Sequence, residues 1–364
     1  MGSRREFLKD AAGACGLAFV GCAASGAAAA IRRHAPVMLQ GRRVRTIDMH
    51  AHCVVPEAIS LLQQAAGAPA QNGAAQSAQL LLQVQGFEQR LRDMDAQGID
   101  MAVLSINPNW YETGRDVAAA IIDRQNAAMA EFCATHSERF AALALVALQF
   151  PELATEQLAN AVSKMGLRGA AIGGSIAGVE LSDPKFHPFF AKAEELGVVV
   201  FIHPQPSSVL NPRLQGNGPL AGTVWYPLET TLALTHLIWE GTLDRFPGLK
   251  ILAAHGGGYL GSYMHRADHG CTISPNQCRP GVPKKPPSEY LKQLYFDSLV
   301  FTPEALRHLA AEVGADHIVV GTDYPFPWVT EPIDHVLRTP ELDDAQKRAI
   351  LGETAARLLG LKPA

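Results

Sequence analysis

Short apolar runs recur along the chain and alternate with longer segments of helical periodicity. Eight such runs predict β-strands, at Val44–Met49, Met101–Ile106, Phe140–Val146, Gly169–Ile172, Val198–Ile202, Lys250–Ala254, Leu294–Ser298 and Ile318–Gly321. Apolar residues three or four positions apart predict helices between them, at Phe87–Gln97, Arg115–Thr135, Pro151–Lys164, His187–Glu195, Leu228–Arg245 and Pro303–Val313. Strand–helix alternation is typical of a parallel sheet, and eight repeats favour its closure. We therefore predict an α/β fold, a (β/α)8 TIM barrel.

Two segments interrupt this alternation. Pro56–Gly86 is rich in Ala, Gln and Gly and follows the first predicted strand. Because barrel enzymes keep their active-site loops after the strands, we expect a cap-like insertion there. His265–Pro287 contains Cys271 and Cys278 and several prolines. We expect it to form a long, rigid loop after the sixth strand, with assembly as its candidate role.

The first thirty residues form a separate unit. Ser3-Arg4-Arg5-Glu6-Phe7-Leu8-Lys9 precedes a short run of small and apolar residues that ends in Ala27–Ala30. This pattern resembles a twin-arginine signal peptide, and an amphipathic helix is the alternative. We expect 1–30 to direct periplasmic export through the twin-arginine machinery, with 31–364 as the enzyme domain. Cys22 offers an alternative site for a lipid anchor.

Composition narrows the class of protein. The chain has 364 residues, of which 48% are hydrophobic and 18% charged, and its net charge is −4. No basic run indicates a nucleic-acid partner, and no apolar stretch after the signal is long enough to span a membrane. In an oxidising compartment, Cys271 and Cys278 are expected to pair, whereas Cys53 and Cys133 are expected to stay free.

Ligand-type side chains stand at the ends of four predicted strands. His50 and His52 close the first strand, and residues two apart on an extended chain point the same way. His203 and His255 end two further apolar strands, and Asp323 ends the last. Barrel chemistry gathers at the carboxyl ends of strands, so we expect these side chains to meet.

These motifs resemble the amidohydrolase superfamily, and in detail its branch of metal-dependent decarboxylases that includes aminocarboxymuconate-semialdehyde decarboxylase. The resemblance rests on five segments, Arg92–Ile99, Phe201–Pro204, Arg245–Pro247, Ala254–Gly258 and Gly321–Pro327. It implies a metal held by His50, His52, His203 and Asp323. It also implies that His255 is catalytic, and that Arg266 binds a substrate carboxylate across the interface of a homodimer.

Physical chemistry agrees with these implied roles. Three imidazoles and a carboxylate suit Zn²⁺, with Mn²⁺ as an alternative, and no organic cofactor is expected. Imidazole exchanges protons near neutral pH, as His255 would have to do, and Asp323 is a second candidate for proton transfer. We expect Gly256–Gly258 to let substrate approach the backbone.

Further residues are weaker candidates for the site. Asp297 is expected to hydrogen-bond a ligand imidazole. Trp225 and Tyr226 are candidates for lining the pocket or for packing, and so are Phe326 and Trp328. Arg266 has the alternative of being an ordinary surface arginine.

Three functions stay open at this point. The resemblance favours decarboxylation of an aromatic or conjugated carboxylic acid. The alternative is hydrolysis of an ester, lactone or amide, and the third is a catalytically inactive binding protein. Two departures from the named decarboxylase put its substrate in doubt. Gly67–Gly86 contains no arginine or lysine, and Gln205 stands where that enzyme has tryptophan.

Overall fold

The computed structural model describes residues 34–65, 84–205, 220–278 and 283–362. The expected signal peptide, including Cys15 and Cys22, and much of the expected cap lie outside these residues. Among the residues described, no helix is both long and apolar enough to cross a membrane.

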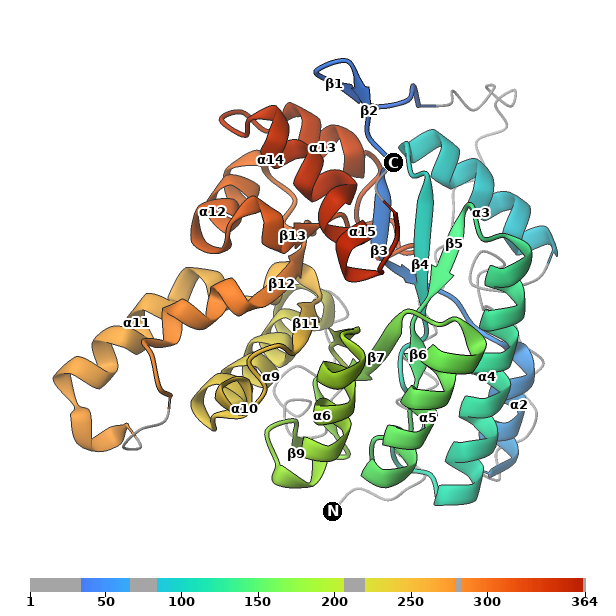
Figure 1. Cartoon of the computed structure of the whole chain (residues 1–364), viewed down its shortest axis with the longest axis horizontal. Coiled ribbons are helices and arrows are strands. Elements are labelled where there is room, and N and C mark those ends of the chain that lie inside the picture. Colours follow the sequence, from blue (N-terminus) through green and yellow to red (C-terminus); the bar gives the residue numbers. More distant parts are fainter. Residues whose placement is uncertain (1–33, 66–83, 206–219, 279–282, 363–364) are drawn as a thin grey trace.

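Parallel strands form a barrel, as the sequence predicts (Figure 1). In chain order they are β3 (Ile47–His52), β4 (Met101–Ser105), β5 (Phe140–Ala142), β6 (Ala144–Leu145), β7 (Gly169–Gly173), β10 (Val199–His203), β11 (Lys250–Ala253), β12 (Leu294–Asp297) and β13 (Ile318–Val319). Strands β3 to β5 form one sheet, and β6, β7 and β10 to β13 form another. Parallel bridges from Asp48 to Val320 and from Ala51 to Tyr324 join the first strand to the last and close the ring.

Helices cover the outside of this ring. They are α2 (Pro56–Ala65), α3 (Val84–Gln97), α4 (Arg115–Thr135), α5 (Pro151–Met165), α6 (His187–Leu196), α9 (Tyr226–Trp239), α10 (Thr242–Arg245), α11 (Leu260–Ile273), α12 (Pro303–Val313), α13 (Pro332–Arg338), α14 (Asp344–Arg348) and α15 (Thr354–Leu358). Two short antiparallel hairpins form separate sheets, β1 (Met38–Leu39) with β2 (Arg42–Arg43) and β8 (Ser175–Ile176) with β9 (Val179–Glu180).

The hydrophobic pattern explains these elements. In β10, Val199 to Ile202 are completely buried, because a strand inside a ring of helices meets protein on both faces. Helix α12 begins where the Thr302 side chain accepts a hydrogen bond from Ala305 N at 3.1 Å. It then buries a stripe that includes Leu306, Leu309 and Val313 against the core.

Several predicted boundaries were wrong. The first strand runs to His52, because its ladder with β4 continues as far as the His52–Ser105 pair. The run predicted as one strand over Phe140–Val146 is two strands with different neighbours, since β5 pairs with β4 and β6 with β7. The helix predicted over Leu228–Arg245 is interrupted at Gly241, whose φ is 80°.

The segment expected as a long loop after the sixth strand was also predicted wrongly, because α11 continues through it to Ile273. In Figure 1 this helix extends away from the barrel. The expected pairing of Cys271 with Cys278 is confirmed, with a Cα–Cα distance of 5.7 Å. Cys53 and Cys133 are free, as predicted.

The described start of the expected cap is helix α2. It packs against α4, and Glu57 lies 4.0 Å from Arg124 across that contact. Residues 66–83 of the expected cap lie outside the described residues.

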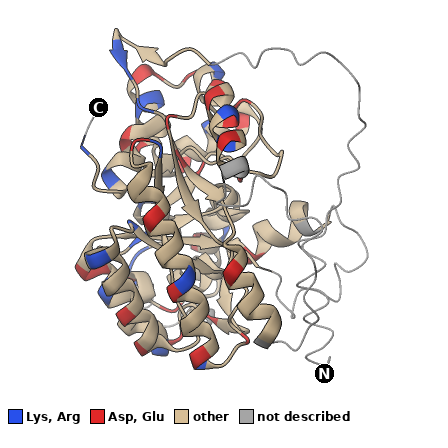
Figure 2. Cartoon of the chain, turned by 90° about the vertical axis from the view of Figure 1, so that its right-hand side faces the viewer, with Lys and Arg blue, Asp and Glu red and all other residues tan. Residues whose placement is uncertain are grey.

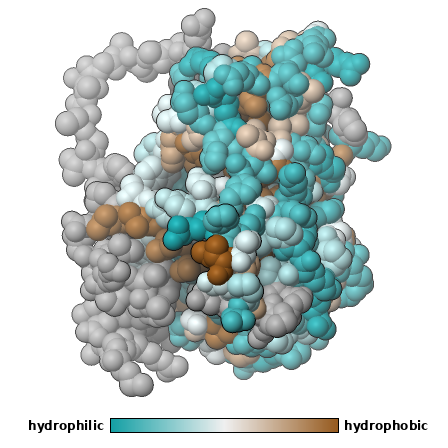
Figure 3. Space-filling view, turned by 90° about the vertical axis from the view of Figure 1, so that its left-hand side faces the viewer, coloured by the Kyte–Doolittle hydropathy of each residue, from teal (hydrophilic) through white to brown (hydrophobic). Residues whose placement is uncertain are grey.

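The described surface carries charges of both signs. Figure 2 shows acidic and basic residues interspersed over the outer helices. The side seen in Figure 3 is largely hydrophilic, with a smaller apolar area. The side seen in Figure 2 has no continuous basic face of the kind that binding to a nucleic-acid backbone would need.

Candidate metal centre

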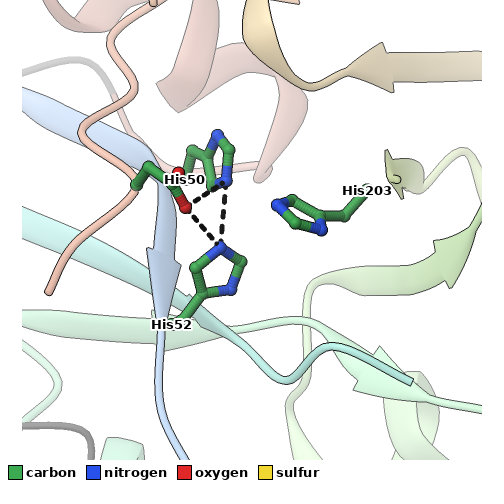
Figure 4. Close-up of side chains that lie close together, drawn as sticks. His50, His52 and His203 are labelled. Atoms are coloured by element: carbon green, nitrogen blue, oxygen red, sulfur yellow. Dashed lines mark hydrogen bonds and ion pairs between the residues drawn. The ribbon is translucent and has the colours of Figure 1, made fainter. Parts of the chain in front are cut away.

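Three histidines face one another inside the barrel (Figure 4). His50 and His52 project from the same strand, β3, and their Nε2 atoms are 3.0 Å apart. His203, the last residue of β10, approaches from another part of the ring, with its ring centroid 5.0 Å from that of His50 and 4.7 Å from that of His52. The predicted convergence of the strand ends is therefore present.

Asp323 completes this cluster. Its Oδ1 lies 2.8 Å from His52 Nε2 and 3.2 Å from His50 Nε2. One ligand atom from each of His50, His52, His203 and Asp323 lies within 4.8 Å of the others, and all four residues are buried. Asp323 also has a φ of 58°, in the left-handed region, which is uncommon for residues other than glycine.

The cluster has the properties of a cation site. Neither ring nitrogen of His203 has a hydrogen-bond partner among the described residues, although the side chain is buried. An unpartnered buried nitrogen is costly, and a metal ion would satisfy it. The residues present therefore fit a divalent ion.

Electrostatics support this interpretation. Burial holds the pKa of His52 below its ordinary value and the pKa of His203 well below, so both imidazoles are neutral and able to coordinate. Burial alone would also lower the pKa of His50, but the charges of Asp323 and Asp297 raise it to about 10. The carboxylates of Asp323 and Asp297 thus favour a positive charge at the position of His50.

Asp297, at the end of β12, orients part of the cluster. Its Oδ2 lies 2.7 Å from His50 Nδ1, which confirms the predicted contact with a ligand imidazole. It also accepts hydrogen bonds from His255 N at 2.9 Å and Gly256 N at 2.8 Å. Burial would raise the pKa of Asp297, but the His50 interaction holds it below its ordinary value.

His255 lies beside the cluster without being part of it. Its Nε2 is 3.6 Å from Asp323 Oδ2, and its ring centroid is 5.3 Å from that of His50 and 5.2 Å from that of His203. Its side chain is 16% exposed, more than those of His50 and His52. His255 is therefore placed to exchange a proton with a molecule bound at the cluster.

The glycines after His255 have a different role from the one predicted. A Cβ at Gly256 would lie 2.5 Å from Val300, and one at Gly258 would lie 2.0 Å from the carbonyl oxygen of Pro227. Neighbouring elements already fill the space beside these glycines. They allow α9 and the segment after β12 to pack closely against the turn that follows His255, instead of leaving room for substrate.

The other predicted residues lie at different distances from the cluster. Arg266 is exposed on α11, and within one chain that helix carries it away from the barrel. Trp225 is buried at the start of α9, with its ring centroid 6.0 Å from that of Tyr226. Phe326 lies near the cluster, 6.1 Å from the ring of His52.

Sequence reasoning missed three residues that support the ligands. Ser105 Oγ lies 3.3 Å from His52 Nδ1, and Asp48 accepts hydrogen bonds from His50 N at 3.0 Å and the Thr322 hydroxyl at 2.6 Å. Arg90 donates to the His52 carbonyl at 2.6 Å. A signal existed for Arg90, because it lies on the face of its helix that also carries Phe87 and Met94.

Fold and site together define a metal-binding α/β barrel. A family model described as amidohydrolase matches residues 47–361, and the chain belongs to this family. The match includes the barrel strands and all four residues of the cluster.

Several proteins with similar sequences are named as decarboxylases. The chain is 31% identical over 281 residues to 2-amino-3-carboxymuconate-6-semialdehyde decarboxylase of Dictyostelium discoideum, which covers 75% of this chain and 76% of the relative. It is also 31% identical over 336 residues to gamma-resorcylate decarboxylase of a Rhizobium species, covering 86% of this chain and 97% of the relative.

A solved structure extends the similarity to three dimensions. Dihydroxybenzoic acid decarboxylase from a Polaromonas species, with bound manganese and the inhibitor 2-nitroresorcinol, has a TM-score of 0.73 and 27% identity to this chain. The alignment covers 88% of this chain and 98% of that protein.

Proposed function

We propose that this protein is a metal-dependent carboxy-lyase that removes CO₂ from an aromatic or conjugated carboxylic acid without oxidation. The carrying observation is the position of His255, 3.6 Å from Asp323 and beside a buried cluster of three histidines and one aspartate. The decarboxylase relatives support this reaction over hydrolysis. We propose a substrate of the same chemical class as theirs, and no particular acid.

His50, His52, His203 and Asp323 would hold the ion. Its chemistry would be to act as a Lewis acid toward a substrate oxygen. We propose zinc, because three imidazoles and one carboxylate suit it, and manganese is the alternative supported by the manganese-containing neighbour. Metal analysis of protein purified without added metal distinguishes the two.

His255 would supply the proton that replaces the carboxylate. The bond between the carboxylate and the substrate carbon breaks, CO₂ leaves, and the bonding electrons stay on that carbon. One proton from the His255 imidazole then neutralises it, and solvent reprotonates the imidazole. Asp323 Oδ2, at 3.6 Å from His255 Nε2, would keep the ring directed toward the reacting carbon.

We further propose that the protein works as a homodimer in which Arg266 of each chain binds the substrate carboxylate in its partner. Arg266 is exposed on α11, a helix that projects from the barrel and also exposes Tyr263 and Ile273. Analytical ultracentrifugation should give a dimer. A monomer with full activity would refute this assignment, and Arg266 would then be an ordinary surface residue.

Trp225 is proposed as a wall of the substrate pocket. It is buried, and its indole N–H has no hydrogen-bond partner among the described residues. Its exchange for Phe keeps the aromatic surface but removes that donor. A rise in KM with unchanged kcat would support substrate contact, whereas unchanged kinetics would leave packing as its role.

Export is a separate proposal, because the segment that carries it lies outside the described residues. Arg4 and Arg5 belong to the twin-arginine pattern, which predicts periplasmic delivery of the folded enzyme. Replacing both with Lys should retain the protein in the cytoplasm. A Cys22→Ser variant that leaves the membrane fraction would indicate a lipid anchor, and an unchanged distribution would exclude one.

The reaction is tested by measuring CO₂ release from a panel of hydroxylated benzoic and dienoic acids, using protein with measured metal content. We expect catalytic CO₂ release with at least one of these acids. Turnover of lactones or esters with no CO₂ from any acid would place the protein among the hydrolases. Metal binding without either activity would favour a binding protein.

A further inference from the structure

Arg90 is a charged side chain buried inside the barrel wall. It belongs to α3, and only 1% of its surface is exposed. Burying a guanidinium costs several kcal/mol unless its surroundings compensate, so a purely space-filling role would be better served by an apolar residue. The partners of Arg90 therefore indicate its function.

Two of its contacts are with the segments that supply candidate metal ligands. Arg90 Nη2 donates a hydrogen bond to the backbone oxygen of His52 at 2.6 Å. Its guanidinium carbon also lies 4.5 Å from the centroid of the Tyr324 ring, a cation–π arrangement. Because Tyr324 follows Asp323 directly, a single side chain contacts both ligand-bearing segments.

A second residue of helix α3 contacts the hydroxyl end of the Tyr324 side chain. The Tyr324 hydroxyl donates to Asp93 Oδ2 at 2.8 Å, and Asp93 lies one helical turn after Arg90. The two ligand segments are joined to each other as well, since His52 N donates to the carbonyl oxygen of Tyr324 at 2.7 Å. Arg90 and Asp93 thus hold Tyr324 in place, and with it the backbone next to Asp323.

Asp323 needs such support. Its φ of 58° is less favourable for a residue with a side chain than for glycine, so neighbouring contacts are needed to hold it. Without the Arg90–Tyr324 contact, the backbone at Asp323 would be freer to relax. Its carboxylate would then leave the 2.8 Å distance to His52 Nε2.

We propose that Arg90 is a positioning residue that sets the distance between His52 and Asp323 and thereby the affinity of the site for a divalent ion. The inference rests on the metal site of the proposed function, but not on the reaction. Asp297 and Ser105 orient the imidazoles of candidate ligands through their side chains, whereas Arg90 would act on the backbone at His52 and next to Asp323.

Arg139 provides a matched control. It also contacts the α3 region, because its Nη2 lies 2.9 Å from Asp95 Oδ1, and its Nε donates to the carbonyl oxygen of Asp100 at 2.8 Å. These contacts tie α3 to the beginning of β4, and none of them involves a metal ligand. Loss of Arg139 should therefore affect stability without affecting metal binding.

The experiment compares wild type with Arg90→Met, Arg90→Lys and Arg139→Met by titrating Zn²⁺ against a chromophoric chelator, with no substrate present. Arg90→Met should lower metal affinity by about 10–100-fold, the usual effect of removing a group that supports ligands. Arg90→Lys should fall between, because an ammonium lacks the planar fork that reaches His52 and lies flat on Tyr324. Arg139→Met should lower the unfolding temperature and keep the wild-type affinity.

Wild-type affinity in a folded Arg90→Met protein would overturn the proposal and leave Arg90 a structural residue. If that variant does not fold, Arg90→Lys decides, and unchanged affinity there also overturns it. An equal loss of affinity in Arg139→Met would do the same, because the effect would then follow stability in general. Normal metal binding in wild type without any decarboxylation would instead contradict the proposed reaction alone.

Discussion

At the scale of single residues, Asp297 connects the two halves of the site. One carboxylate oxygen, Oδ2, contacts both His50 Nδ1 at 2.7 Å and His255 N at 2.9 Å. The same group thus orients a candidate ligand and fixes the backbone that carries the candidate proton donor. His255 has a φ of 57°, and this hydrogen bond to its backbone, together with the close packing of the following glycines, holds that backbone conformation.

We predict that His255→Asn lowers kcat by about 10²–10⁴-fold, because asparagine cannot transfer the proton. Asparagine tolerates the positive φ at this position, so the backbone should stay intact. Steady-state kinetics and metal analysis on the same sample check both points. His317→Asn is the matched control, since His317 stacks on Tyr295 before β13 and should leave turnover unchanged. Undiminished turnover in the His255→Asn variant would remove His255 from the mechanism.

At the scale of elements, the sequence predicts best where one physical effect dominates. The barrel strands are recognisable because burial on both faces makes them continuous apolar runs. His203 therefore stands at the end of β10 as predicted, whereas Asp323 lies beyond the end of β13, which stops at Val319. Helix α11 was missed because it leaves the body of the protein and has no long apolar stripe; it exposes Tyr263 and Ile273.

Contacts between distant elements could not be read from the sequence. The crowding at Gly258 comes from Pro227, and the need for Arg90 comes from Tyr324. Neither contact produces a repeating pattern of apolar and polar residues in the sequence. Local chemistry at a strand end predicts ligands, but the groups that support those ligands depend on how the helices pack.

A substitution at Gly258 tests how much this close packing contributes to stability. Gly258→Ala should lower the free energy of unfolding by about 3 kcal/mol or more, because it adds a clash with the Pro227 carbonyl to the strain of a φ of 66°. Gly166→Ala shares the positive φ, but nothing lies within 4 Å of its added Cβ, so a loss of about 1 kcal/mol is expected. Denaturant unfolding of both variants measures the difference. Equal losses would show that crowding at Gly258 is unimportant.

At the scale of the whole molecule, the site lies at the seam where the barrel closes. The Asp48–Val320 bridge and the hydrogen bond from Asp323 N to the His50 carbonyl, at 2.8 Å, join the first strand to the end of the last. The four candidate ligands come from both sides of this seam and from β10. A bound ion would therefore link parts of the chain that only the complete fold brings together.

Metal removal should consequently destabilise the whole barrel. An ion that binds only the folded state contributes about 2.7 kcal/mol when its free concentration is a hundred times its Kd. We expect dialysis against a chelator to lower the unfolding temperature, and Zn²⁺ or Mn²⁺ to restore it. His203→Ala, which removes one ligand, should show a weaker response to added metal. An unfolding temperature independent of metal would contradict the site.

The most direct test of the central claim is to run the reaction in D₂O and examine the product by NMR. Non-oxidative decarboxylation predicts one deuterium on the carbon that lost the carboxylate and one CO₂ per product molecule, formed about 10²–10⁴-fold more slowly by the His255→Asn variant. Turnover that adds water across an ester or lactone, leaving every carboxylate in place and no deuterium on carbon, would contradict the account.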